Sequence, residues 1–189
     1  MLYRFMILCL LTFNAAYAAN QEDLQKLIKL NGSAPKSLDL SNADLRSYTF
    51  NADKTNLQNA NLSHANLANA DLTSMNLSNA DLSYANLENA HLSGAMLVNT
   101  NLNHAILKNA NLAQADLSSA NLNSASLLNA NLEQANVSKA DFTCANLNNA
   151  SLVKANFSEA VISSATFVNT VTTDISNYDS VVDNHINCN

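Results

Sequence analysis

Few residues in this 189-residue chain are of a type that does chemistry, and their spacing limits what they could do. They include three histidines, His64, His91 and His104, and the carboxylate of Asp71. Two histidines can bind zinc if each lies about 2 Å from the metal, and a histidine–carboxylate pair can move a proton at hydrogen-bond distance. Whether these side chains meet depends on the elements that hold them.

The segment from Met1 to Ala18 has the pattern of a secretory signal peptide. Arg4 provides a positive charge, Phe5 to Phe13 form an apolar run, and Ala16-Tyr17-Ala18 is a small-x-small cleavage pattern. We predict cleavage after Ala18 and export to a bacterial periplasm or to the medium. The alternative is an uncleaved membrane anchor, but the apolar run is short for a bilayer span, so we expect no stable span after processing.

The cysteines become informative once export is considered. Cys9 is removed with the signal peptide, which leaves Cys144 and Cys188. An even pair of cysteines in an oxidising compartment is a candidate disulfide. The alternative is two unpaired thiols, with Cys188 in a frayed terminus.

The charge of the chain argues against nucleic-acid binding. The formal net charge is −6, and residues 55–170 contain three lysines and seven acidic side chains. A nucleic-acid interface requires a basic patch, whereas a mildly acidic surface favours solubility.

A five-residue repeat dominates the chain. From Leu57 to Phe167 every fifth residue is a large apolar residue, which we call the centre, and alanine stands two residues before 20 of these 23 centres. A spacing of five does not keep leucines on one face of an α-helix or of a strand. The pattern therefore predicts a coil that bends after every five residues, with stacked coils burying a column of leucine and alanine.

The residue two positions after each centre indicates the size of the coil. One series keeps asparagine in every fourth pentapeptide, which predicts four pentapeptides per coil and a ladder of bonded amides at about 4.8 Å per rung. For the corners we expect asparagine in left-handed backbone angles and most other residues in type I turns. The predicted structural residues are the wall residues Leu62, Leu82, Leu102, Leu122, Phe142, Phe157 and Phe167, and the ladder Asn69, Asn89, Asn109, Asn129, Asn149 and Asn169.

Such a coil separates the residues that could do chemistry. His64 and His104 would lie two rungs, about 10 Å, apart, which is too far for a shared zinc ion. Cys144 has no histidine within one rung of its column, so no nucleophile–base pair is apparent. The pairs His91 with Asp71 and Lys108 with Glu88 would be surface neighbours. We predict no catalytic, metal or cofactor site.

The segments "ANLENAHLSGA", "NADLSYANL" and "NANLAQADLSSANL" resemble the pentapeptide-repeat proteins, whose consensus is A-(D/N)-L-x-x. The resemblance implies an all-β solenoid, a right-handed quadrilateral β-helix, over residues 38–170. It implies little about function, because the family is functionally diverse.

The two ends depart from the repeat. We expect an N-terminal cap at 19–37 with a short amphipathic helix over about 21–30, and a bulge near 51–55, where Phe50 and Leu57 are further apart than the repeat allows. Residues 171–189 are predicted to be a capping tail. The alternative is that this C-terminal end forms a homodimer contact.

Outward apolar residues are the only hint of a partner. Ile106 and Leu128 fall on one face in successive coils and are candidate contacts for an unidentified protein partner. We therefore predict a non-catalytic exported structural or protein-interaction module that presents flat polar faces. The alternative is the DNA mimicry by which some relatives bind DNA gyrase, which the signal peptide and the weak acidity disfavour.

Overall fold

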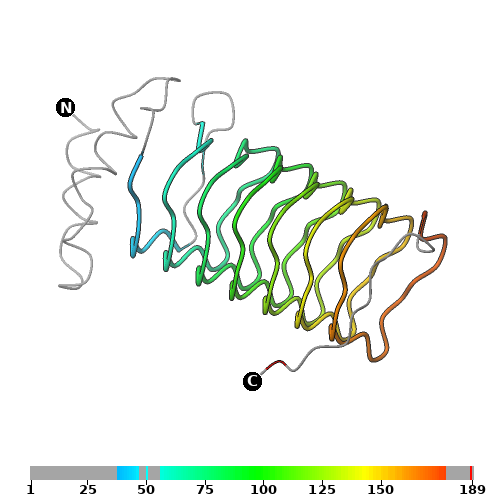
Figure 1. The fold of residues 1–189 in the computed structure, drawn as a ribbon. Coiled ribbons are helices and arrows are strands. Elements are labelled where there is room, and N and C mark those ends of the chain that lie inside the picture. Colours follow the sequence, from blue (N-terminus) through cyan, green and yellow to red (C-terminus); the bar gives the residue numbers. More distant parts are fainter. Residues whose placement is uncertain (1–37, 47–49, 51–55, 178–187, 189) are drawn as a thin grey trace, which may run out of the picture.

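The chain winds into a stack of four-sided coils that runs from residue 38 at one end to residue 177 at the other (Figure 1). This computed structural model describes residues 38–46, 50, 56–177 and 188. The predictions for the signal peptide, the N-terminal cap, the shape of the bulge at 51–55 and most of the C-terminal tail fall outside the described residues.

Successive coils pair as parallel strands of minimal length. Asn61 pairs with Asp81, Asp81 with Asn101, and so on at every fourth pentapeptide. Each pairing is a single-residue bridge at the position before a centre, and the described ranges contain no helix and no longer strand. The structure is thus a β-helix with four pentapeptides per coil, as the period of the asparagine series predicted.

We number the sides by their centres. The first side contains Leu57 and every twentieth residue after it, the second Leu62, the third Leu67 and the fourth Leu72. The corner after the second side is the histidine corner, and the corner after the third is the asparagine corner. Their residues are His64, Tyr84, His104, Ser124, Cys144 and Ser164 for the histidine corner, and Asn69, Asn89, Asn109, Asn129, Asn149 and Asn169 for the asparagine corner.

The corners correct one sequence-based expectation. The residue two positions after each centre has a φ near +60° throughout, whether it is asparagine, histidine, tyrosine, lysine or glutamate. Ala65 N–H also donates to the Leu62 carbonyl at 3.0 Å, so the turn is of type II rather than the expected type I. The reason is the peptide between Ser63 and His64, which lies along the coil axis. Its carbonyl accepts from Asn42 N–H and its N–H donates to the Ser83 carbonyl, each at 2.9 Å.

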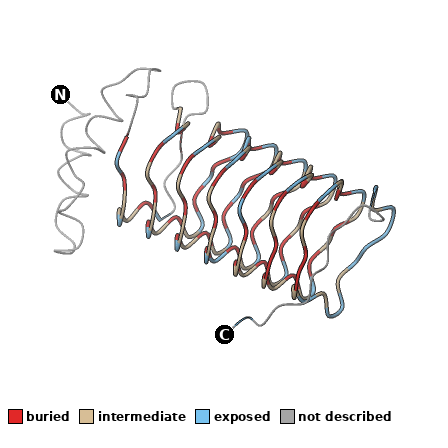
Figure 2. Cartoon of the chain, in the orientation of Figure 1, coloured by how far each residue is buried: buried red, intermediate tan, exposed pale blue. Residues whose placement is uncertain are grey.

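The core is a column of buried residues that recur in every coil of the stack (Figure 2). Leucine and alanine of the repeat are 0–1% exposed from Leu57 to Ala160, and the rings of Phe142 and Phe157 stack at 5.6 Å. Thr100 occupies an alanine position, and its hydroxyl donates to the Leu77 carbonyl at 2.8 Å. Buried polar groups are usually satisfied in this way.

The register shows where each end of the repeat lies. Asp39 pairs with Asn61 and Asp44 with Asn66, so two extra residues are accommodated in the first coil before the regular spacing begins. At the other end the pairing continues to Ser176, beyond the expected boundary at 170. The backbone pairing forms there although the centres are no longer leucine. Ile175, at an alanine position, packs against the core.

Candidate functional site

The histidine corner contains a stack of three aromatic rings. Tyr84 lies between His64 and His104, with ring centroids 4.9 Å and 4.8 Å apart and ring planes inclined by 5° and 15°. The spacing follows from the backbone rungs, which place equivalent side chains about 4.8 Å apart. The Tyr84 side of the stack is open to solvent, since the residue is 50% exposed.

Sequence reasoning considered the two histidines without the tyrosine between them. The sequence does contain the pattern that predicts the stack. The same position in three successive groups of four pentapeptides is occupied by His64, Tyr84 and His104. With a phenol ring between the imidazoles, the two histidines cannot share a metal ion. In the described part of the chain, no group of three histidine, cysteine or acidic side chains could hold a metal.

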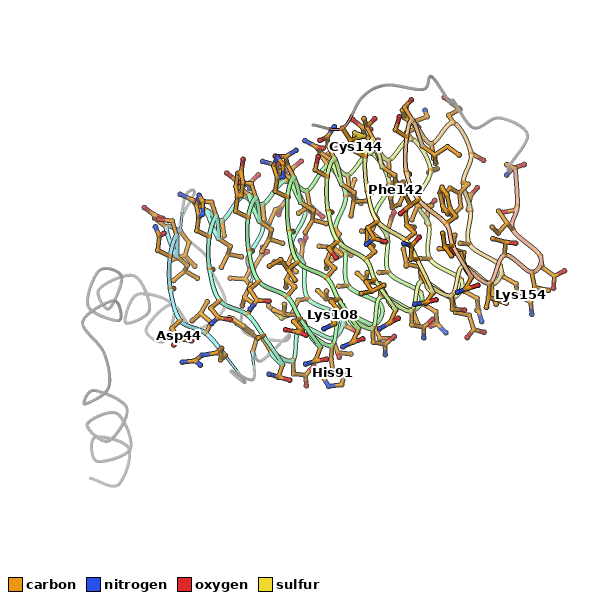
Figure 3. The ribbon with its side chains drawn as sticks, turned by 90° about the horizontal axis from the view of Figure 1, so that it is seen from below. Asp44, His91, Lys108, Phe142, Cys144 and Lys154 are labelled. Atoms are coloured by element: carbon orange, nitrogen blue, oxygen red, sulfur yellow. A yellow bond between two sulfur atoms is a disulfide. The ribbon has the colours of Figure 1, made fainter. Side chains whose placement is uncertain are left out.

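Cys144 lies on the same corner and forms a disulfide with Cys188, with their Cα atoms 5.6 Å apart. Figure 3 shows Phe142 inside the coils and Cys144 at their outer edge. Thr143 and Ser163, the residues just before the corner in two successive coils, are 8% and 3% exposed. The equivalent residues of lower coils are only half-buried.

The asparagine corner is occupied by one chemical group throughout. From Asn89 to Asn169, each side-chain amide donates from Nδ2 to Oδ1 of the asparagine one coil below, and Asn69 is the first acceptor. The distances are 2.9–3.3 Å. A shorter row on the corner after the first side has one such bond, from Asn99 to Asn79 at 3.3 Å. The ladder therefore links the asparagine corner of six successive coils by side-chain hydrogen bonds as well as by backbone hydrogen bonds.

The third side places an exposed aliphatic residue next to the aromatic stack. Ile106 is 44% exposed, and its N–H donates to the carbonyl of Ala85, the residue after Tyr84. Leu128 is half-buried, so it offers less surface than Ile106. Lys108 forms an ion pair with Glu88 at 3.3 Å beside them. The exposed side chain of Ile106 thus lies on the column next to the one that holds the exposed ring of Tyr84.

The polar pairs that could do chemistry lie on the outside of the coils. Asp71 and His91 are bridge partners on the fourth side, and both are exposed. Hydrogen bonds from the Thr73 hydroxyl and N–H, and then the nearby His91, lower the pKa of the Asp71 carboxyl below its usual value. The pKa of Asp44 is lowered chiefly by its hydrogen bond to Arg46. Neither carboxyl is therefore adapted to donate a proton near neutral pH.

The model of pentapeptide repeats matches residues 55–94, and the model of a pentapeptide-repeat region matches residues 82–157. The crystal structure of HetL, a protein involved in heterocyst differentiation regulation from the cyanobacterium Nostoc, is 30% identical over 74% of this chain and 81% of its own, with a TM-score of 0.46. This chain belongs to the pentapeptide-repeat family.

Other solved structures match as well, one of them a second pentapeptide-repeat protein. One from the thylakoid lumen of Arabidopsis thaliana is 30% identical, over 55% of this chain and 69% of its own, with a TM-score of 0.48. QnrB1, a plasmid-mediated fluoroquinolone resistance protein, is 15% identical over 79% of this chain and 77% of its own, with a TM-score of 0.41. No curated protein sequence matches significantly. Within the described residues there is no helix with the length and apolar character of a membrane span.

Proposed function

We propose that this pentapeptide-repeat protein is a non-catalytic, exported protein-interaction module. Its contact surface is centred on Ile106 and Tyr84, where the third side meets the histidine corner. The observation that carries the proposal is that these two exposed side chains, Ile106 at 44% and Tyr84 at 50%, lie on adjoining columns, whereas exposed Met96 lies on the opposite side of the coil. Tyrosine is one of the residue types that contribute most to binding at protein interfaces, especially where apolar side chains lie beside it.

The rigidity of the scaffold supports this role. Each pentapeptide of the inner coils forms backbone hydrogen bonds with the coils above and below, so its side chains are held in fixed columns. A surface that is ordered before binding loses little conformational entropy when a partner docks. Leu128 completes the patch one rung above Lys108 on the third side.

Export rests on the signal-peptide pattern of residues 1–18 and is supported by the disulfide, because structural disulfides persist in oxidising compartments. Mass spectrometry of the protein purified from its native cells should find a chain that begins at Ala19. An intact chain beginning at Met1 in the soluble cytoplasm would contradict export. The right-handed sense of the coil, the N-terminal capping helix and the C-terminal homodimer contact stay predictions.

A matched pair of variants tests the contact surface. Ile106→Glu places a charge in the patch, whereas Met96→Glu places the same charge on the opposite first side, at a residue that is also 44% exposed. Both variants and the wild type are cross-linked in the source cells and the captured proteins are quantified. We expect one captured protein to decrease about tenfold or more with Ile106→Glu, as for a central interface residue, and to be retained with Met96→Glu. Equal capture by all three would contradict the proposed surface.

A further inference from the structure

The last coil of the described chain, residues 157–177, has another described coil on one side only. In the coil below it, the N–H groups of Leu147 and Asn149 donate upward to Thr166 and Val168 at 2.9 Å and 2.8 Å. Among the described residues no coil lies beyond the last one to accept such bonds from Phe167 and Asn169. Since a solenoid repeat is stabilised by its two neighbour interfaces, this coil has weaker support than the coils in the middle of the stack.

Burial shows the same difference. Ala145 and Leu147 are 1% and 0% exposed, whereas their equivalents one coil later, Ala165 and Phe167, are only half-buried. Val168 and Val171 are 62% and 48% exposed. Opening of this coil would therefore remove less apolar surface from contact than opening of any coil in the middle of the stack.

The disulfide closes a covalent loop around this weak coil. Cys144 and Cys188 are 44 residues apart, and the segment between them contains all of residues 157–177. Cys188 also lies beside the next coil, with its sulfur 4.0 Å from the Ser164 carbonyl oxygen. The burial of Thr143 and Ser163 marks the same stretch of the histidine corner. Cys188 is thus bonded to one coil and lies against the next.

We propose that this disulfide is a redox-sensitive lock on the terminal coil. A dithiol reductant would donate two electrons and two protons to the sulfur–sulfur bond, leaving thiols on Cys144 and Cys188 and a disulfide on the reductant. Cys188 is exposed and Cys144 half-buried, so the bond is accessible. Without it, residues 157–177 keep their non-covalent contacts with the coil below. These include the hydrogen bonds from Val161 N–H to the Ala140 carbonyl and from Asn169 Nδ2 to Asn149 Oδ1, and the stack of Phe142 on Phe157.

Reduction should therefore loosen one end of the solenoid and leave the middle intact, because the loop encloses only that end. Local opening of a terminal unit requires less free energy than global unfolding, and hydrogen exchange reports the two separately. The inference does not depend on the proposed interaction surface, since Tyr84 and Ile106 lie outside the loop.

Hydrogen–deuterium exchange of the full chain, before and after treatment with dithiothreitol, tests the lock. We expect the amides of residues 157–177 to exchange about tenfold faster or more after reduction, and those of residues 77–116 to exchange at an unchanged rate. The double variant Cys144→Ser, Cys188→Ser should exchange fast at 157–177 in both conditions.

Reoxidation of the reduced wild type should restore slow exchange, which keeps the test valid if the variant folds poorly. Equal rates at 157–177 in the two redox states would overturn the proposal. Acceleration of equal size at 77–116 would also overturn it, because the disulfide would then stabilise the fold as a whole.

Discussion

The asparagine corner and the histidine corner have the same backbone and different side-chain chemistry. Both have a φ near +60° at every rung and the same axial hydrogen bonds. The asparagine corner repeats one amide–amide bond, whereas the histidine corner changes from stacked rings at His64, Tyr84 and His104 to a disulfide at Cys144. The backbone therefore sets the spacing, and any pair of side chains that interacts well at about 4.8 Å can occupy it.

The asparagine corner maintains the fold, whereas the histidine corner gives individual coils different properties. A uniform ladder adds the same small contribution at each rung, as expected of a structural column. A column that changes chemistry along its length gives each coil its own properties, namely an exposed aromatic surface in one region and a covalent bond in another. Substitutions at the two corners can test this contrast, beginning with what the corners share.

The largest effect should be common to both corners. Leu102→Ala removes wall packing behind His104, and Leu107→Ala removes it behind Asn109, where both leucines are fully buried. Each substitution should lower the free energy of unfolding by about 2–5 kcal/mol. The two losses should be similar, because both substitutions create the same kind of cavity in the wall. Urea denaturation of the two variants measures this. A difference above about 1.5 kcal/mol would show that the corners rest on unequal walls.

The next effect should be specific to the histidine corner. Replacement of Cys144 and Cys188 by serine opens a loop whose ends are 44 residues apart and should lower the free energy required to open residues 157–177 by about 3–4 kcal/mol on the chain-entropy model. Hydrogen exchange at residues 157–177 of the oxidised wild type and of the double variant measures the loss, with Ser124→Ala on the same corner as a control. Equal exchange rates at 157–177 in the wild type and the double variant would contradict the prediction.

A smaller effect should reveal the ladder of the asparagine corner. Asn109 donates to Asn89 at 3.0 Å and accepts from Asn129 at 2.9 Å, whereas Asn99 has one amide–amide bond of this kind, to Asn79. Asn109→Ala should therefore lower the free energy of unfolding by about 0.5–1.5 kcal/mol more than Asn99→Ala. Both residues have a positive φ, so the backbone cost of alanine is matched. Equal denaturation midpoints would argue against a ladder contribution.

The smallest effect should come from the ring stack. Tyr84→Leu keeps an apolar side chain but removes two ring contacts at an exposed position, and we expect a loss of about 0.5 kcal/mol, the lower end for aromatic pairs. Tyr84→Phe keeps the ring and serves as the control. A Tyr84→Leu variant as stable as Tyr84→Phe would mean that the stack contributes only to the surface and not to stability.

The coil itself can be predicted from the order of residues alone. Centres at every fifth residue and asparagine at every twentieth specify a four-sided solenoid. Each pentapeptide has a large apolar centre that must be buried, and the equivalent pentapeptides of the neighbouring coils provide the apolar surface that buries it. The wall residues from Leu62 to Phe157 are buried accordingly, and Phe167, in the last described coil, is half-buried.

The interactions between coils become visible only in the folded stack. The type II corner arises because the turn peptide has to align with the axis and bond to both neighbouring coils, which no local turn preference encodes. Tyr84 stacks between two histidines, and Ile106 is more exposed than Leu128, because the environment of each side chain is set by residues in the neighbouring coils. A periodic sequence thus determines its own coil, while the contacts across rungs depend on which side chains the register brings together.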